Sequence, residues 1–119
     1  MAKILLVDDE EAILNMYGSA LVEHEVIKAR NGKEALEMAE KDAPELILLD
    51  IIMPKENGLD VLVKLKTGDK TKDIPVIVLT NLPEEASAEK AKSLGSNGYF
   101  VKAKIEPTTL AEEVNNLLK

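Results

Sequence analysis

The chain has 119 residues, of which 45% are hydrophobic and 31% charged, and its formal net charge is −7. This length and composition fit one globular domain with a single core, and they exclude a disordered chain. The negative charge disfavours binding to the phosphates of nucleic acids, and the absence of cysteine excludes disulfides, thiol catalysis and thiolate metal sites. No stretch is typical of a signal peptide or a membrane span, so we expect a cytoplasmic protein.

Short apolar runs alternate with helical patterns along the whole chain. The predicted strands are Lys3–Val7, Glu25–Ala29, Leu46–Leu49, Pro75–Leu79 and Gly98–Val101; the predicted helices are Ala12–Val22, a segment from the Asn31 cap to before Pro44, Leu59–Leu65, Pro83–Leu94, and a last one starting at Pro107. Alternation of this kind predicts a parallel sheet covered by helices on both faces. We therefore expect an α/β fold with a single five-stranded parallel sheet of order 2-1-3-4-5 and five flanking helices, as in flavodoxin-like proteins.

The spacing of apolar residues predicts which helix faces are buried. The predicted stripe of the first helix is Ile13, Met16, Ala20 and Leu21, and that of the last helix is Leu110, Val114, Leu117 and Leu118. In the second helix Asn31 is followed by Glu34 at the spacing of a capping box.

The most informative stretch runs from residue 45 to residue 58. Its apolar run Leu46–Leu49 is typical of a central strand buried on both faces, and Asp50 follows it directly. Ligands bind at the carboxyl ends of the strands in open α/β sheets, so this carboxylate lies where a functional group is expected. Taken alone, Asp50 could equally well cap the turn that Met53-Pro54 and Asn57-Gly58 indicate.

Polar side chains also follow three other predicted strands. Asp8 and Asp9 end the first strand, Thr80 the fourth and Lys102 the fifth. Each residue has an ordinary explanation, as a helix cap, a strand former or a solvated strand end. Together with Asp50, however, three carboxylates at one sheet edge repel one another unless a cation neutralises them, and hard oxygen ligands suit Mg²⁺. The Thr80 hydroxyl and the Lys102 ammonium are groups that can bind the oxygens of a phosphoryl group.

These motifs, in this order, resemble the receiver domains of two-component response regulators, the CheY-like family. The resemblance rests on four runs, which are Leu6-Val7-Asp8-Asp9-Glu10, Leu48-Leu49-Asp50-Ile51-Ile52-Met53-Pro54 with Gly58, Val78-Leu79-Thr80, and Gly98-Tyr99-Phe100-Val101-Lys102. It covers the whole chain and implies one receiver domain over residues 1–119.

The resemblance implies a phosphoacceptor switch. Asp50 would receive a phosphoryl group from a histidine kinase or a histidine phosphotransfer protein. Asp8, Asp9, Asp50 and the backbone carbonyl of Ile52 would hold Mg²⁺.

The resemblance also assigns the residues that follow the phosphoryl group. Lys102 and Thr80 would bind its oxygens, and Tyr99 would be the aromatic residue whose rotamer follows Thr80. A tyrosine that only packs at a strand end is the alternative for Tyr99. The fourth helix, fifth strand and last helix would then present the surface read by a downstream protein or output domain, or by a second copy in a phosphorylation-dependent homodimer.

Two features depart from the family. Ala103 follows the lysine where receiver domains usually have a proline joined by a cis bond, so we expect either a trans bond or a strained cis bond at this position. The segment between Tyr17 and Ala29 is shortened relative to the family.

Two other functions use similar residues. A Mg²⁺-dependent phosphatase with an aspartyl intermediate would need a second acid shortly after Asp50, but Ile52 occupies the nearest such position. A pseudo-receiver that binds partners and never takes phosphate would not need the complete set of acids, threonine and lysine. We therefore expect a switch and not an enzyme with a diffusible substrate. No output domain follows Lys119, which fits either a stand-alone protein or an excised domain.

Overall fold

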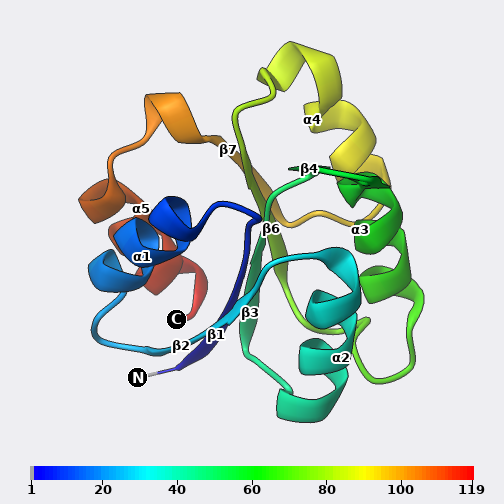
Figure 1. The fold of residues 1–119 in the computed structure, drawn as a ribbon, viewed down its shortest axis with the longest axis horizontal. Helices are drawn as coiled ribbons and strands as arrows, with labels where there is room; N and C mark the ends of the chain where they lie inside the picture. Colours follow the sequence, from blue (N-terminus) through cyan, green and yellow to red (C-terminus); the bar gives the residue numbers. More distant parts are fainter. Residues whose placement is uncertain (1) are drawn as a thin grey trace.

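The computed structural model describes residues 2–119. Its five-stranded sheet has the order β2-β1-β3-β6-β7, with every neighbouring pair parallel (Figure 1). The strands are β1 (Lys3–Val7), β2 (Glu25–Ala29), β3 (Leu46–Leu49), β6 (Val76–Thr80) and β7 (Gly98–Val101). The predicted fold and strand order are confirmed, with the predicted fourth and fifth strands corresponding to β6 and β7.

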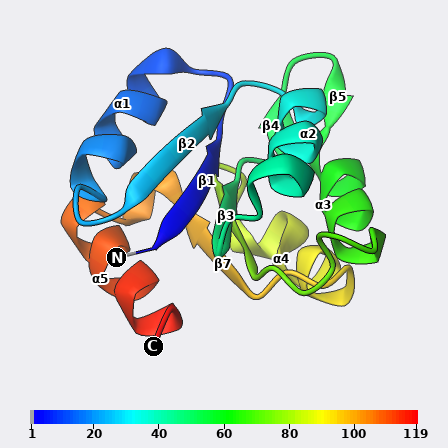
Figure 2. The same ribbon diagram turned by 90° about the horizontal axis from the view of Figure 1, so that it is seen from below.

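Five helices cover the two faces of the sheet. Helices α1 (Glu11–Ala20) and α5 (Pro107–Leu117) lie on one face, and α2 (Gly32–Asp42), α3 (Gly58–Thr67) and α4 (Glu84–Ser93) lie on the other (Figures 1 and 2). The sheet therefore separates two hydrophobic cores. Within residues 2–119, no helix is long and apolar enough to cross a membrane.

The three central strands are buried almost throughout, whereas β2 is partly exposed at the sheet edge. A strand covered by helices on both faces has no solvent side, so its sequence becomes a continuous apolar run. The run Leu46–Leu49 meets this requirement, and all four of its side chains are fully buried. The more alternating sequence of β2 agrees with its place at the edge.

Two predicted helix stripes are partly wrong. In α1 the buried side chains are Leu14 and Tyr17, while Met16 is 42% exposed; the predicted Leu21 is buried directly after the helix. Both stripes have helical spacing, so periodicity alone does not distinguish them; turning the helix toward Tyr17 buries a much larger side chain. In α5, Leu110 and Val114 are buried as predicted, but Leu117 is 45% exposed near the end of the helix.

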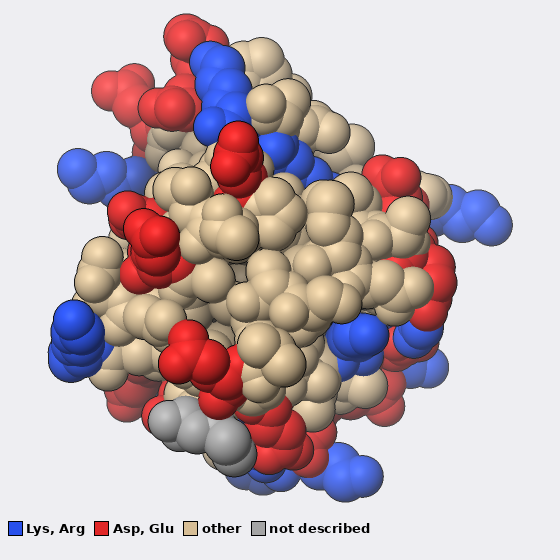
Figure 3. Space-filling view, turned by 90° about the vertical axis from the view of Figure 1, so that its left-hand side faces the viewer, with Lys and Arg blue, Asp and Glu red and all other residues tan. Residues whose placement is uncertain are grey.

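The face covered by α1 and α5 has a broad uncharged area (Figure 3). Acidic side chains border this area, and the Lys and Arg side chains visible from this side lie in separate groups (Figure 3). This arrangement agrees with the net charge of −7 and gives that face no continuous basic surface for a nucleic acid.

A small hairpin follows Asp50 and was not predicted from the sequence. Strands β4 (Ile52–Met53) and β5 (Glu56–Asn57) pair antiparallel, and Lys55 between them has a left-handed backbone with φ of 65°. The Asn57 side chain then caps α3 by accepting a hydrogen bond from the Leu59 amide at 2.9 Å. The hairpin thus connects the end of the central strand directly to the start of a helix.

Gly58 closes this hairpin against the backbone of Ile51. The Gly58 amide donates to the Ile51 carbonyl at 3.0 Å, and a Cβ atom added at Gly58 would lie 2.2 Å from Ile51 Cα. No side chain fits at this distance, so a glycine is required for close approach.

We predict that Gly58→Ala lowers the free energy of unfolding by about 1–3 kcal/mol or more, because backbone must move to admit the methyl group. Gly18→Ala is the matched control, since a Cβ there meets only the flexible end of Lys28, at 3.2 Å from Cε. Within a helix, that change should raise the free energy of unfolding by about 0.5–1 kcal/mol. Urea denaturation measures both, and equal stability of Gly58→Ala and wild type would contradict the proposed close contact.

Candidate functional site

The carboxyl ends of the strands meet at one edge of the sheet and bring three distant residues into contact. Asp8 follows β1, Asp50 follows β3, and Lys102 follows β7. Asp8 is 1% and Asp50 4% exposed. The sequence-based expectation that these side chains converge is met.

Lys102 joins the two buried carboxylates. Its Nζ atom donates to Asp8 Oδ2 at 2.5 Å and to Asp50 Oδ2 at 2.9 Å. The remaining oxygens accept backbone amides, with Glu10 donating to Asp8 Oδ1 and Ile52 donating to Asp50 Oδ1, both at 2.9 Å. Every carboxylate oxygen of the pair therefore has a donor, as buried charges require.

The electrostatics of the cluster follow from this burial. Burial raises the pKa of Asp8 above its usual value, and the hydrogen bonds from Lys102 and Glu10 offset only part of that rise. Burial alone would lower the pKa of Lys102, but hydrogen bonds to Asp50 and Asp8 outweigh it and raise the pKa of the ammonium. Lys102 is therefore firmly protonated and is the positive partner of both acids.

Asp9 adds a third carboxylate from the solvent side. It is exposed, and one oxygen from each of Asp8, Asp9 and Asp50 lies within 4.8 Å of the others. Three hard oxygen donors at this spacing, partly open to water, suit a divalent cation that keeps some of its own water ligands. Ile52 lies beside the cluster in β4, and the residue is 51% exposed.

Thr80 and Tyr99 are connected through the backbone of Leu82. Thr80 is fully buried, and its Oγ1 accepts from the Leu82 amide at 3.4 Å. The Tyr99 hydroxyl donates to the Leu82 carbonyl at 2.8 Å and lies 2.5 Å from Ser87 Oγ. Because the tyrosine has one hydroxyl hydrogen, Ser87 is the donor in the second contact.

The loop after Lys102 contains no cis bond and forms a short 3₁₀ turn, Lys102–Lys104. The trans alternative considered for Ala103 is the one observed. The Ala103 amide donates to Asn81 Oδ1 at 3.0 Å, a hydrogen bond that proline could not make. Asn81 thus ties the loop after β6 to the loop after β7.

Sequence reasoning missed Asn81 and Ser87. Their hydrogen bonds join residues 22 and 12 positions apart, so no local pattern indicates them. For Asn81 one signal was available: the residue after Lys102 is an alanine and not a proline, so it has a backbone amide that needs an acceptor.

Comparison with known proteins agrees with this geometry. The family model of the response regulator receiver domain matches residues 4–115. The chain belongs to this family. Receiver domains are signalling modules of two-component systems, so membership favours a signalling domain over a phosphatase with a diffusible substrate.

Three similar proteins illustrate the range of the family. The chain is 34% identical to protein PilH of Pseudomonas aeruginosa over 122 residues, covering 99% of the chain and 98% of PilH. It is 37% identical to the probable transcriptional regulator ycf27 of Porphyra purpurea, covering 98% of the chain but only 47% of ycf27, so it spans about half of that relative. The solved structure of chemotaxis response regulator CheY4 of Vibrio cholerae is similar with a TM-score of 0.87 at 32% identity, covering 98% of both chains.

Removing the Lys102 ammonium that Asp8 and Asp50 share should destabilise the receiver domain. We predict that Lys102→Met lowers the free energy of unfolding by about 3 kcal/mol or more in metal-free buffer, because it leaves two neighbouring buried carboxylates unpaired. The exposed Lys104, two positions along, gives the control variant Lys104→Met, which should unfold like wild type. Urea unfolding monitored by circular dichroism makes the comparison; a Lys102→Met protein as stable as the control would contradict the central role of this ion pair.

Proposed function

We propose that this receiver domain accepts a phosphoryl group on Asp50 from a histidine kinase or a histidine phosphotransfer protein, in a Mg²⁺-dependent reaction. The observation that carries the proposal is the Asp50 carboxylate itself, which ends a central strand, contacts Lys102 at 2.9 Å and lies within 4.8 Å of two further acids. Similar solved structures support it, among them a phosphorylated RcpA at 33% identity and a Mn²⁺-bound Rcp1 at 29% identity.

The chemistry is an in-line displacement. An Asp50 oxygen attacks phosphorus, the phosphorus–nitrogen bond of phosphohistidine breaks, and the imidazole departs with the electron pair. Lys102 already contacts Asp50 and can follow the new charge to a phosphoryl oxygen. Asp8, Asp9, Asp50 and the Ile52 carbonyl would hold Mg²⁺, which when bound supplies positive charge against the entering phosphate.

Thr80 and Tyr99 form the proposed switch. A phosphoryl group on Asp50 adds about −1.5 to −2 charge and new acceptor oxygens. If the Thr80 hydroxyl turns to one of these oxygens, it leaves the Leu82 amide that it now accepts from, and the carbonyl of the same residue accepts from Tyr99. Movement of the Leu82 backbone would therefore reach Tyr99 and, through Ser87, helix α4.

The partner surface is proposed for α4, β7 and α5. A pocket of about 300 Å³ opens there, lined by residues of all three elements, among them Glu84, Tyr99 and Thr109. The buried side chains of α4 are only Ser87 and Ala91, so the helix is weakly anchored and suited to move. A downstream protein, an output domain or a second copy of the receiver domain would read the state of the switch at this surface.

The phosphoacceptor is tested with a small phosphodonor. Incubated with acetyl phosphate and Mg²⁺, the protein should gain a single phosphoryl group, which intact mass spectrometry detects, because Asp50 is the proposed acceptor and the other acids, Asp8 and Asp9, are proposed only as metal ligands. Asp50→Asn should remove the adduct. An adduct that persists in this variant would move the acceptor elsewhere, and a wild type without any adduct would favour a pseudo-receiver.

The switch is tested by amide hydrogen exchange with and without beryllofluoride, which mimics the phosphoryl group. Exchange should change mainly over residues 80–94 and 99–104, because the backbone of Leu82 connects Thr80 to Tyr99 and, through Ser87, to α4. The variant Tyr99→Phe lacks the hydroxyl contacts and should show a smaller change in α4 than wild type. Changes confined to the surroundings of Asp50, or centred on α2, would contradict this route.

A further inference from the structure

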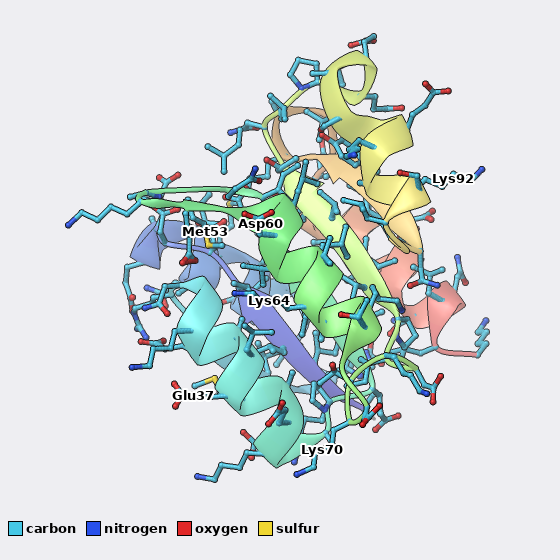
Figure 4. All side chains as sticks on the ribbon, turned by 90° about the vertical axis from the view of Figure 1, so that its right-hand side faces the viewer. Glu37, Met53, Asp60, Lys64, Lys70 and Lys92 are labelled. Atoms are coloured by element: carbon cyan, nitrogen blue, oxygen red, sulfur yellow. The ribbon has the colours of Figure 1, made fainter. Side chains whose placement is uncertain are left out.

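Glu56 makes an unusual contact for a residue on a surface hairpin. It is half-buried in β5, and its carboxylate accepts a hydrogen bond from the amide of Gly32, the first residue of α2. The two residues are 24 positions apart. In Figure 4 the hairpin that carries Met53 lies over the adjacent ends of α2 and α3, on the side from which Asp60 projects.

Two other backbone amides near the start of α2 have side-chain acceptors within the same segment. Asn31 Oδ1 accepts from the Glu34 amide at 2.9 Å, and Glu34 Oε1 accepts from the Arg30 amide at 3.0 Å. Glu56 supplies the acceptor for the Gly32 amide, one of the helix-terminal donors that lacks a partner within its own helix. The contact is close, since a Cβ added at Gly32 would lie 2.7 Å from Glu56 Oε1.

The hairpin transmits this contact to the acid cluster. Glu56 pairs with Met53, and Asn57 pairs with Ile52. The Ile52 amide donates to Asp50 Oδ1 at 2.9 Å. Glu56 therefore anchors strand β5 of the hairpin, and the paired strand β4 carries the Ile52 amide that donates to Asp50.

We propose that Glu56 is a positioning residue for the metal site. By holding the hairpin against the start of α2, it keeps the backbone of Ile52 in place beside Asp50, so that the Ile52 amide stays hydrogen-bonded to the carboxylate and the Ile52 carbonyl stays available to a cation. This inference rests on the proposed function, in which Asp50 and the Ile52 carbonyl hold Mg²⁺. Residues that orient metal ligands commonly change metal affinity strongly when they are replaced.

Two variants of Glu56 distinguish an effect of its hydrogen bond to Gly32 from an effect of its negative charge. Glu56→Ala removes both the acceptor and the negative charge, whereas Glu56→Gln removes the charge and keeps an acceptor oxygen for the Gly32 amide. Glu37→Ala is the matched control, because Glu37 is an exposed glutamate of α2 (Figure 4). Asp9→Ala serves as the reference for a damaged metal site.

The first measurement is Mg²⁺ affinity of the unphosphorylated proteins by isothermal titration calorimetry. Glu56→Ala should bind Mg²⁺ about tenfold more weakly than wild type, the lower end of the range for residues that support metal ligands. Glu56→Gln and Glu37→Ala should stay close to wild type, and Asp9→Ala should be weakened most. Circular dichroism melting establishes that each variant is folded at the titration temperature.

The second measurement needs no metal. In buffer with a chelator, amide exchange at Gly32 and Ile52 should be faster in Glu56→Ala than in wild type and unchanged in Glu56→Gln, because only the first variant frees the hairpin.

The outcomes distinguish the two proposals. Wild-type protein that does not bind Mg²⁺, or binds it as weakly as Asp9→Ala, contradicts the proposed function. If wild type binds Mg²⁺ and Glu56→Ala binds it with the same affinity, only the positioning role of Glu56 is overturned. A Glu56→Gln protein as weak as Glu56→Ala also overturns it, because charge and not the hairpin contact would then set the affinity.

Discussion

The structure depends on one ammonium group held between two buried carboxylates. Asp8 and Asp50 are almost fully buried, and the side chain of Lys102 that joins them is 6% exposed. Like charges in such surroundings repel strongly, and the effective attraction to a shared cation is correspondingly large. The arrangement is stable only if the backbone holds all three groups at fixed distances. The three strands that end in these residues belong to one sheet, which provides that rigidity.

Parallel topology brings the functional groups together, and the loops then decide how each can move. Asp8 and Asp50 directly follow buried strands, and each accepts a hydrogen bond from a backbone amide two residues further on, so their positions follow from the sheet. Thr80 and Lys102 are followed by loops that Asn81 and Ala103 join. The half of the site built on β1 and β3 is therefore stiff, while the half built on β6 and β7 is connected to the weakly anchored α4.

The sequence predicted the sheet, its order and the convergence of Asp8, Asp50 and Lys102, because these depend on apolar periodicity and on where strands end. It predicted the buried face of α1 only in part: Leu21 is buried and Ile13 packs against the core, but Met16 is exposed, since the stripe through Met16 has the same helical spacing as the one through Tyr17. The hairpin after Asp50 was also missed. Its two-residue strands are too short for a periodic signal, and the contact of Glu56 with Gly32 joins segments that are adjacent only in the folded chain.

The charge of the cluster links the proposed metal and phosphoryl groups. Lys102 is a single positive group among three acids, so the cluster retains excess negative charge and favours a cation. An entering phosphoryl group adds further negative charge at the same point, which makes its binding more favourable when a cation is present; by thermodynamic reciprocity the phosphoryl group then strengthens cation binding to the same extent. Lys102 cannot satisfy Asp8, Asp50 and a phosphoryl oxygen equally well, so a cation beside the acids frees it to follow the phosphate. Any element that fixes the cation ligands, the β4–β5 hairpin included, therefore also influences how readily Lys102 changes partner.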